Sequence, residues 1–254
     1  MPSWTLNTSL RGFDMLTKNY LKAHYKMNDD AATPVVIDEI GNYNGTYKDG
    51  SGNINTDTGA SVGKMKGALE FDGDEYVDLG DDIDSLFAGK SIMSFSAWVK
   101  ITTFVDTAGL IGLGDSASRQ CWLYSVTTPS RLRWTISTTT GTTGPISGTL
   151  VINQWYHVVG TYDGAWIRLY MDTVLMTPVA SAGVIADGSN NNFLGRLQGF
   201  GYSKSIIDNV MFFNKVLTLA DVILLNNGGA GRETIPPNVR LSRTGQGFSS
   251  RQEM

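Results

Sequence analysis

The sequence predicts an all-β protein, a sandwich of two antiparallel sheets with one short helix near its C-terminal end. The 29 glycines follow no collagen-like period and cluster between short apolar runs, as turn residues do. Those runs have the length and alternation of strands. Only residues 218–228 combine a helical apolar pattern with start and stop signals.

The predicted strands follow one another through the centre of the chain, separated by turn chemistry. A half-buried strand is expected at 20–27, whereas 48–63 and 137–148 are expected to be loops. The clearest hairpin joins two strands through Asp163-Gly164, a pair favoured in two-residue turns. The central strands are expected at 68–71, 76–79, 92–101, 110–113, 121–126, 131–136, 155–162, 165–171, 192–197 and 205–213.

The strand at 205–213 is apolar on both faces, which indicates burial on both sides. Alternation places Asp208 in the middle of one apolar row, and a buried carboxylate requires a cation, hydrogen-bond donors or a shifted pKa. The two predicted rows are Ile206, Asp208, Val210 and Phe212 on one face and Ile207, Asn209, Met211 and Phe213 on the other.

The expected helix has Thr218 as its N-cap, Asp221 in its first turn and Gly228 as its stop. Beyond it the sequence loses periodicity. The predicted organisation is therefore an N-terminal extension (1–20), one β domain (21–227) and an extended C-terminal arm (228–254).

Composition excludes several classes of protein. A net charge of −4 argues against nucleic-acid binding, which needs a basic face. Cys121 is the only cysteine, so an intrachain disulfide and a cysteine-bound zinc are both excluded. The first residues lack the pattern of a signal peptide, and no run is long enough for a membrane span. We therefore expect synthesis in the cytoplasm without Sec export.

The order of short motifs over about 21–227 resembles the laminin-G-like, concanavalin A-like lectin and glucanase domains. The family's fold is a jelly roll of two antiparallel sheets, in agreement with the strand pattern. Thr173 follows Asp172 where the family usually has Gly. The motifs are DEIGNYNG (38–45), GALEFDGDEYVDLG (67–80), FSAWVK (95–100), WYHVVGTYDG (155–164), IRLYMD (167–172), LGR (194–196) and IIDNV (206–210).

The resemblance implies one structural Ca²⁺ between the loop after the first strand and the last long strand. Its ligands would be Asp38, oxygens around Asn42 and Gly45, and Asp208, since Ca²⁺ prefers carboxylate and carbonyl oxygens. The alternative is that Asp208 accepts backbone N–H bonds or pairs with Arg196 or Lys204.

Catalysis is not expected. Related hydrolases use two glutamates facing one sugar, but the chain has no Glu between Glu75 and Glu233. His157 alternates with core residues and is expected to be packed in its strand rather than catalytic. The acidic run from Asp72 to Asp84 lacks the EF-hand spacing and is interpreted as a solvated edge.

Carbohydrate binding is the remaining chemistry, because sugars stack on aromatic faces while polar groups bind their hydroxyls. For any single Trp, a place in the core remains the more common alternative. The candidate ligand-binding residues are Trp122 and Tyr124 on one strand face, Arg131 and Arg133 on the next, and Tyr202.

The main prediction is a non-catalytic jelly roll in a phage or virus particle, as a decoration or fibre-type protein that displays a surface able to bind cell-surface glycan. The extension and the arm would contact other subunits in an oligomer or larger assembly, and the protein would reside in the virion or outside the cell after lysis. The alternative is a free carbohydrate-binding lectin-like protein, and a glycoside hydrolase ranks third.

Overall fold

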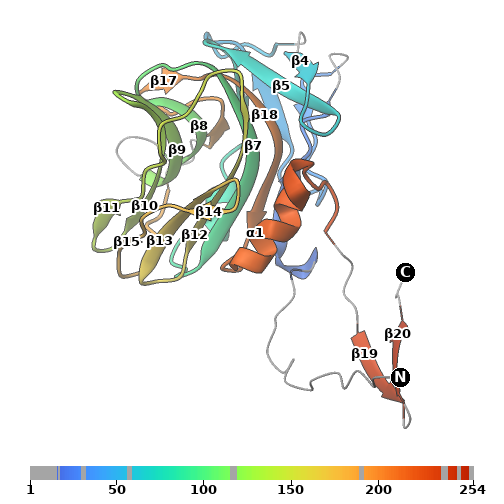
Figure 1. Ribbon diagram of the computed structural model, residues 1–254. Coiled ribbons are helices and arrows are strands. Elements are labelled where there is room, and N and C mark those ends of the chain that lie inside the picture. Colours follow the sequence, from blue (N-terminus) through green and yellow to red (C-terminus); the bar gives the residue numbers. More distant parts are fainter. Residues whose placement is uncertain are drawn as a thin grey trace.

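The computed structural model of this chain describes residues 16, 18–29, 33–55, 59–114, 119–188 and 192–235, together with the backbone of 240–244 and 247–251. The described strands form two large sheets packed face to face, and Figure 1 shows both curving in the same sense. The prediction of an all-β antiparallel sandwich with one C-terminal helix is confirmed.

We call one layer the back sheet. It has the order β14 (Val174–Leu175), β13 (Trp166–Met171), β12 (Trp155–Tyr162), β7 (Met93–Thr103), β18 (Lys204–Phe213), β5 (Gly67–Asp72) and β4 (Ala60–Val62). Two further strands join it, β1 (Leu21–Tyr25) beside β18 and β15 (Val179–Ala180) beside β13.

The other layer, the front sheet, has the order β11 (Gly141–Thr143), β10 (Ser130–Thr138), β9 (Arg119–Thr127), β8 (Ala108–Gly114), β16 (Phe193–Leu194), β6 (Tyr76–Asp78), β3 (Gly45–Lys48) and β2 (Val35–Val36). Strand β17 (Gly201–Tyr202) runs parallel to β8. The chain after residue 239 adds a separate hairpin of β19 (Arg240–Thr244) and β20 (Gly247–Arg251), drawn apart from the sandwich in Figure 1.

Several local predictions were wrong. The strand expected at 192–197 shortens to β16, because the chain turns at Gly195, where φ is +83°. Strands β4 and β11 occupy the segments expected to be loops. In the hairpin between β12 and β13, Asp163 pairs with Trp166, so the two central residues are Gly164 and Ala165 rather than Asp163-Gly164.

The interface between the sheets holds the main hydrophobic core. Trp134 of the front sheet is fully buried against Phe95 of the back sheet, with 4.5 Å between ring centroids. Gly160 lies beside this pair, and a Cβ there would come within 2.2 Å of Phe95 and 2.8 Å of Trp134. The close packing explains why no larger residue occupies that position.

Strand β18 does not alternate strictly as predicted. Its pairing with β7 shifts between Asp208 and Met211, and Asn209 has a φ of +54°, which together define a β-bulge. The extra residue reverses the alternation, so Val210 and Phe212 enter the main core with Ile207, whereas Met211 and Phe213 join a second cluster on the outer side. Asp208 lies before the bulge.

The second cluster covers the outer surface of the back sheet. Helix α1 (Leu219–Asn226) packs Val222 and Leu225 against Met211 and Phe213, and Figure 1 shows it on the side of the molecule away from β8 and β9. The predicted N-cap is confirmed. Thr218 and Asp221 form a reciprocal capping box, and the helix ends at Asn227, which is left-handed.

Short 3₁₀ turns complete the fold at η1 (Lys18–Tyr20), η2 (Ile83–Leu86) and η3 (Asn227–Gly229). Leu16, before η1, and Ile235, after η3, are both buried in the second cluster. The segments that precede and follow the sandwich in the sequence therefore both pack on the back sheet. Among the helices of the described segments, none is long and apolar enough to cross a membrane.

Candidate functional site

The strongest candidate is the outer surface of the front sheet. On β9 and β10 the side chains of Leu123, Leu132 and Trp134 point into the core, so alternate residues point outward. Those outward positions are the four predicted on these strands: Trp122, Tyr124, Arg131 and Arg133. The structure brings them together on one surface, which we call the front face.

Strand pairing places Tyr202 in the same row. Tyr202 pairs with Gly109, Gly109 with Tyr124, and Tyr124 with Arg133. Adjacent strands lie about 4.8 Å apart, so this row spans about 14 Å from β17 to β10. That length suits contact with an extended ligand.

The glycines of β8 allow a chain segment to lie on the front face. A Cβ at Gly109 would come within 2.4 Å of the Leu197 side chain, and one at Gly112 within 2.7 Å of it. Because both positions lack a side chain, residues 195–202 rest directly on β8. This segment carries Arg196, Phe200 and Tyr202 onto the face.

Arg196 is surrounded by three aromatic rings. Its guanidinium carbon is 4.7 Å from the ring centre of Tyr76, 5.0 Å from that of Phe193 and 5.0 Å from that of Tyr202. Stacking of this kind holds the guanidinium plane in place and leaves its N–H edges for a ligand. Sequence reasoning considered Arg196 only as a partner of Asp208, which the structure does not support.

Trp122 and Phe200 pack against each other, and only Phe200 is exposed. Trp122 is only 2% exposed and donates its indole N–H to the Gly114 carbonyl oxygen at 3.1 Å, so it is packed as a core tryptophan would be. Phe200 meets it edge-on, with 5.2 Å between ring centroids, and is 46% exposed. Phe200 therefore offers an exposed aromatic surface to a ligand, and strand alternation did not predict it because it lies in a turn.

The arginines of β10 differ in their surroundings. Arg133 is exposed, whereas Arg131 is half-buried and its Nε atom is buried with no hydrogen-bond partner. A buried N–H without an acceptor costs folding free energy, unless a water molecule or a ligand accepts its hydrogen bond.

The predicted calcium ligands do not converge. Asp38 is 2% exposed, and each of its oxygens accepts two backbone N–H groups. Asn42 is exposed, and Gly45 is buried in β3. The Asp38 carboxylate is thus held by four N–H donors, and N–H groups cannot coordinate a cation. The loop therefore does not fit Ca²⁺, which requires oxygen ligands. The four donors are His24 and Ile40 to Oδ1 and Asn42 and Tyr43 to Oδ2, at 2.8–3.1 Å.

Asp208 has different partners from Asp38. Its Oδ2 accepts the backbone N–H groups of Lys64 at 2.7 Å and Met65 at 3.1 Å, whereas its Oδ1 is buried without a partner. Burial raises its pKa from 3.8 to about 6, and the nearby negative charge of Glu233 adds to the shift. Strand β1 separates the two aspartates, because Tyr25 pairs with Val210 and forms a bridge with Asp38.

Both histidines are buried and hydrogen-bonded. His157 is 1% exposed, its Nε2 lies 2.9 Å from the Ser96 hydroxyl oxygen, and burial lowers its pKa to about 3. His24 Nε2 lies 2.7 Å from Asn209 Oδ1, which fixes the bulge. Both imidazoles are buried away from the front face, which leaves them no access to a substrate there.

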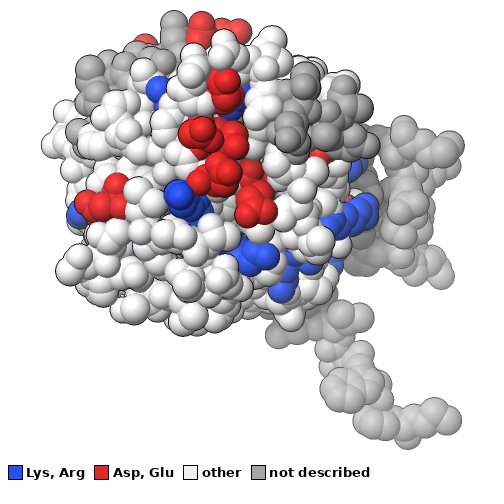
Figure 2. Space-filling model, turned by 90° about the horizontal axis from the view of Figure 1, so that it is seen from above, with Lys and Arg blue, Asp and Glu red and all other residues white. Residues whose placement is uncertain are grey.

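Part of the predicted acidic run forms a surface group, whereas Asp84 at the end of the run is buried, contrary to the prediction of a solvated edge. Carboxylate oxygens of Asp72, Asp74 and Glu75 lie within 4.8 Å of one another. Figure 2 shows acidic side chains gathered on the face seen from above, with basic side chains nearby. Among the described residues nothing else at this group points to a ligand, in keeping with a solvated edge at Asp72, Asp74 and Glu75.

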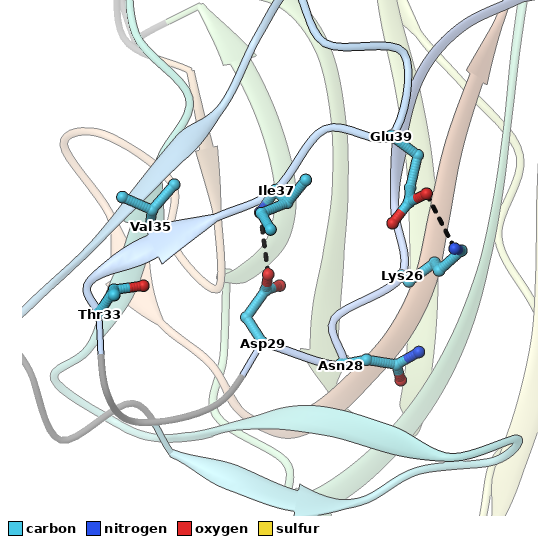
Figure 3. A pocket seen from close by; sticks show the side chains of 7 residues that line it. All are labelled: Lys26, Asn28, Asp29, Thr33, Val35, Ile37 and Glu39. Carbon is cyan, nitrogen blue, oxygen red and sulfur yellow. Dashed lines mark hydrogen bonds and ion pairs between the residues drawn. The ribbon is translucent and has the colours of Figure 1, made fainter.

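A separate pocket of about 460 Å³ lies between the ends of β1 and β2 (Figure 3). Its charged groups already have partners, since Lys26 forms a 2.8 Å ion pair with Glu39 and Asp29 accepts the Ile37 N–H. The pocket therefore offers less recognition chemistry than the front face. Its lining is Lys26, Asn28, Asp29, Thr33, Val35, Ile37 and Glu39.

Comparison with known proteins defines the family. Residues 71–223 match the model of the concanavalin A-like lectin/glucanases superfamily, so the chain belongs to this superfamily. No curated protein matches the sequence.

Solved structures show the same fold at low identity. Domain 4 of AbnA, a GH43 extracellular arabinanase from Geobacillus stearothermophilus solved with arabinotriose, has a TM-score of 0.60 and 22% identity over 80% of this chain and 96% of that domain. Trypanosoma rangeli sialidase (0.61, 14%, 84% of this chain) is matched over 34% of its length. The binding domain of Paraclostridial Mosquitocidal Protein 1 (0.61, 14%, 84%) is matched over 53%.

Proposed function

We propose that this protein is a non-catalytic carbohydrate-binding module whose ligand lies across the front face. The observation that carries the proposal is the row of Tyr202, Tyr124 and Arg133, flanked by Phe200 and by Arg196 on its aromatic rings. Aromatic faces and fixed hydrogen-bond donors are the groups that sugar rings and hydroxyls require.

Membership of a superfamily that includes lectins supports the proposal, as does the arabinotriose complex of a domain with the same fold. The length of the row favours an oligosaccharide over a single sugar, because a monosaccharide would contact only part of it. The packing of Trp122 leaves Phe200, Tyr124 and Tyr202 as the aromatic contacts.

An oligosaccharide array followed by isothermal titration calorimetry tests the proposal. We expect binding to at least one oligosaccharide. Phe200→Ala should lower the affinity about tenfold or more, since the stacking of a ring on one aromatic side chain contributes on the order of 1–3 kcal/mol. Trp166→Ala is the matched control, because Trp166 is 44% exposed but lies on β13 of the back sheet. Equal losses in the two variants, or no binding to any oligosaccharide, would overturn the proposal.

The proposal includes the absence of catalysis, so we expect bound oligosaccharides to be recovered intact by chromatography after long incubation. Shortened products would contradict it. A role in a virus particle, with release by lysis, stays a prediction on which the relatives named above do not bear. Purification as part of a large symmetric particle, lost on deletion of residues 236–254, would support that prediction.

A further inference from the structure

We propose that the front face selects acidic glycans, meaning oligosaccharides that carry carboxylate or sulfate groups. This inference rests on the proposed carbohydrate-binding function and specifies its ligand class. The reason is the presence of Arg131, Arg133 and Arg196 on one surface, where no carboxylate of the described residues forms an ion pair with any of them.

Some of the other cations in the described part of the chain are paired with carboxylates. Ion pairs at 2.7–3.1 Å hold Lys26, Lys48, Lys66 and Lys215, and Arg168 is joined to Asp163. Among the described residues no ion pair holds Arg131, Arg133 or Arg196, so their guanidinium groups are available to an anionic ligand on the front face. Guanidinium groups bind carboxylate and sulfate oxygens through two parallel N–H bonds, which neutral hydroxyls cannot match.

The spacing of the three arginines suits a chain with repeated charges. Arg131 and Arg133 lie two residues apart on the same strand face, about 7 Å along β10. Arg196 stacks on Tyr202 at the other end of the row that reaches Arg133, about 14 Å across the strands. One acidic sugar at each end of an oligosaccharide would meet its own guanidinium group.

Arg131 gives a second, independent indication. Its buried Nε has no partner, whereas the half-exposed side chain keeps the rest of the group accessible. An anion bound through Nε and one terminal nitrogen would satisfy this donor. Asp106, in the loop before β8, uses its carboxylate for Thr127, accepting the Thr127 N–H at 3.2 Å and the Thr127 hydroxyl at 3.3 Å.

Overall charge does not account for this arrangement. The chain has a net charge of −4, so a general attraction for anions is excluded, and any preference for acidic glycans must come from the local surface. An acidic ligand would also bind more weakly at high salt, because exposed charges are screened within about 8–10 Å at 0.1–0.15 M salt.

The test compares acidic oligosaccharides with neutral counterparts, such as trigalacturonate with its methyl ester, on an array that also holds sulfated and neutral oligosaccharides. We expect the hits to be acidic, with affinity falling as NaCl rises from 50 to 300 mM. The double variant R131Q/R133Q should lose at least about tenfold in affinity for an acidic hit. Lys18→Gln, which removes one exposed charge at η1 near the back sheet, is the control and should bind as the parent does.

The outcomes separate the two proposals. Binding restricted to neutral oligosaccharides, or unaffected by R131Q/R133Q, overturns the acidic preference and leaves the carbohydrate-binding function intact. Absence of any binding overturns both. R131K/R133K checks that misfolding is not the cause of the affinity lost in R131Q/R133Q. Because it keeps both charges, it should retain more affinity than the glutamine variant.

Discussion

Replacement of Asp208 by Asn is predicted to alter how stability depends on pH. Burial raises the pKa of Asp208 from 3.8 to about 6, so the folded protein holds this proton more tightly than the unfolded chain does. A raised pKa means that the carboxyl group is most favourable to folding when protonated, below pH 4. That contribution is lost as the pH rises through 6.

The magnitude follows from the size of the shift. About two pKa units, at 1.36 kcal/mol each, correspond to about 3 kcal/mol, of which about 2 kcal/mol develops between pH 4 and pH 7. Asn carries no charge at either pH and can still accept the N–H groups of Lys64 and Met65 through its carbonyl oxygen. The stability of D208N relative to the parent should therefore increase by about 2 kcal/mol from pH 4 to pH 7.

Urea unfolding followed by tryptophan fluorescence, at pH 4, 5, 6 and 7 with a chelator present, measures this difference. Only the difference between the proteins is informative, because His157, whose pKa burial lowers to about 3, makes the parent less stable as the pH falls. For Asp81→Asn, at an exposed carboxylate, the difference in unfolding free energy from the parent should be the same at every pH. A flat difference for D208N as well, within about 0.5 kcal/mol, would refute the reasoning.

Three further predictions concern turns, caps and metal. Thr173→Gly should stabilise the protein by about 1 kcal/mol in urea unfolding, because Thr173 has a φ of +74°, and Thr173→Ala should give no such gain. Thr218→Ala should cost about 1 kcal/mol by removing the acceptor for the Asp221 N–H, and Thr218→Ser should restore most of it. Because both oxygens of Asp38 already accept backbone N–H groups and β1 separates it from Asp208, EGTA should leave the melting temperature unchanged, and a fall of several degrees would show that an ion joins the two.

The fold was predictable because its signals are local. Apolar runs of strand length and the Thr218 cap are each readable within a few residues, and the structure has most of the strands and the helix that they predicted. The alternation of β18 was not, because a bulge adds a residue without changing the sequence pattern. Asn209 tolerates a positive φ and is held by His24 from β1, a contact 185 residues away.

The candidate site was predictable in part for the same reason. Alternation placed Trp122, Tyr124, Arg131 and Arg133 on matching faces of neighbouring strands, and strand pairing preserved that relation. It could not reveal Phe200, which reaches the face only because glycines in β8 let a distant segment lie on the sheet. Likewise, the cluster around Arg196 joins rings from β6, β16 and β17 that no single stretch of sequence contains.

The burial of Leu16 and Ile235 in the same cluster has a consequence for display. The chain enters the sandwich at Leu16 and leaves it at Ile235, and both residues lie on the back sheet, on the side that carries α1. The front face points the opposite way (Figure 1). A body attached through either end would therefore lie behind the domain and would leave the front face unobstructed. Copies side by side on one support would all point their arginines and aromatic rings outward, so that weak single contacts could add up along a polymer.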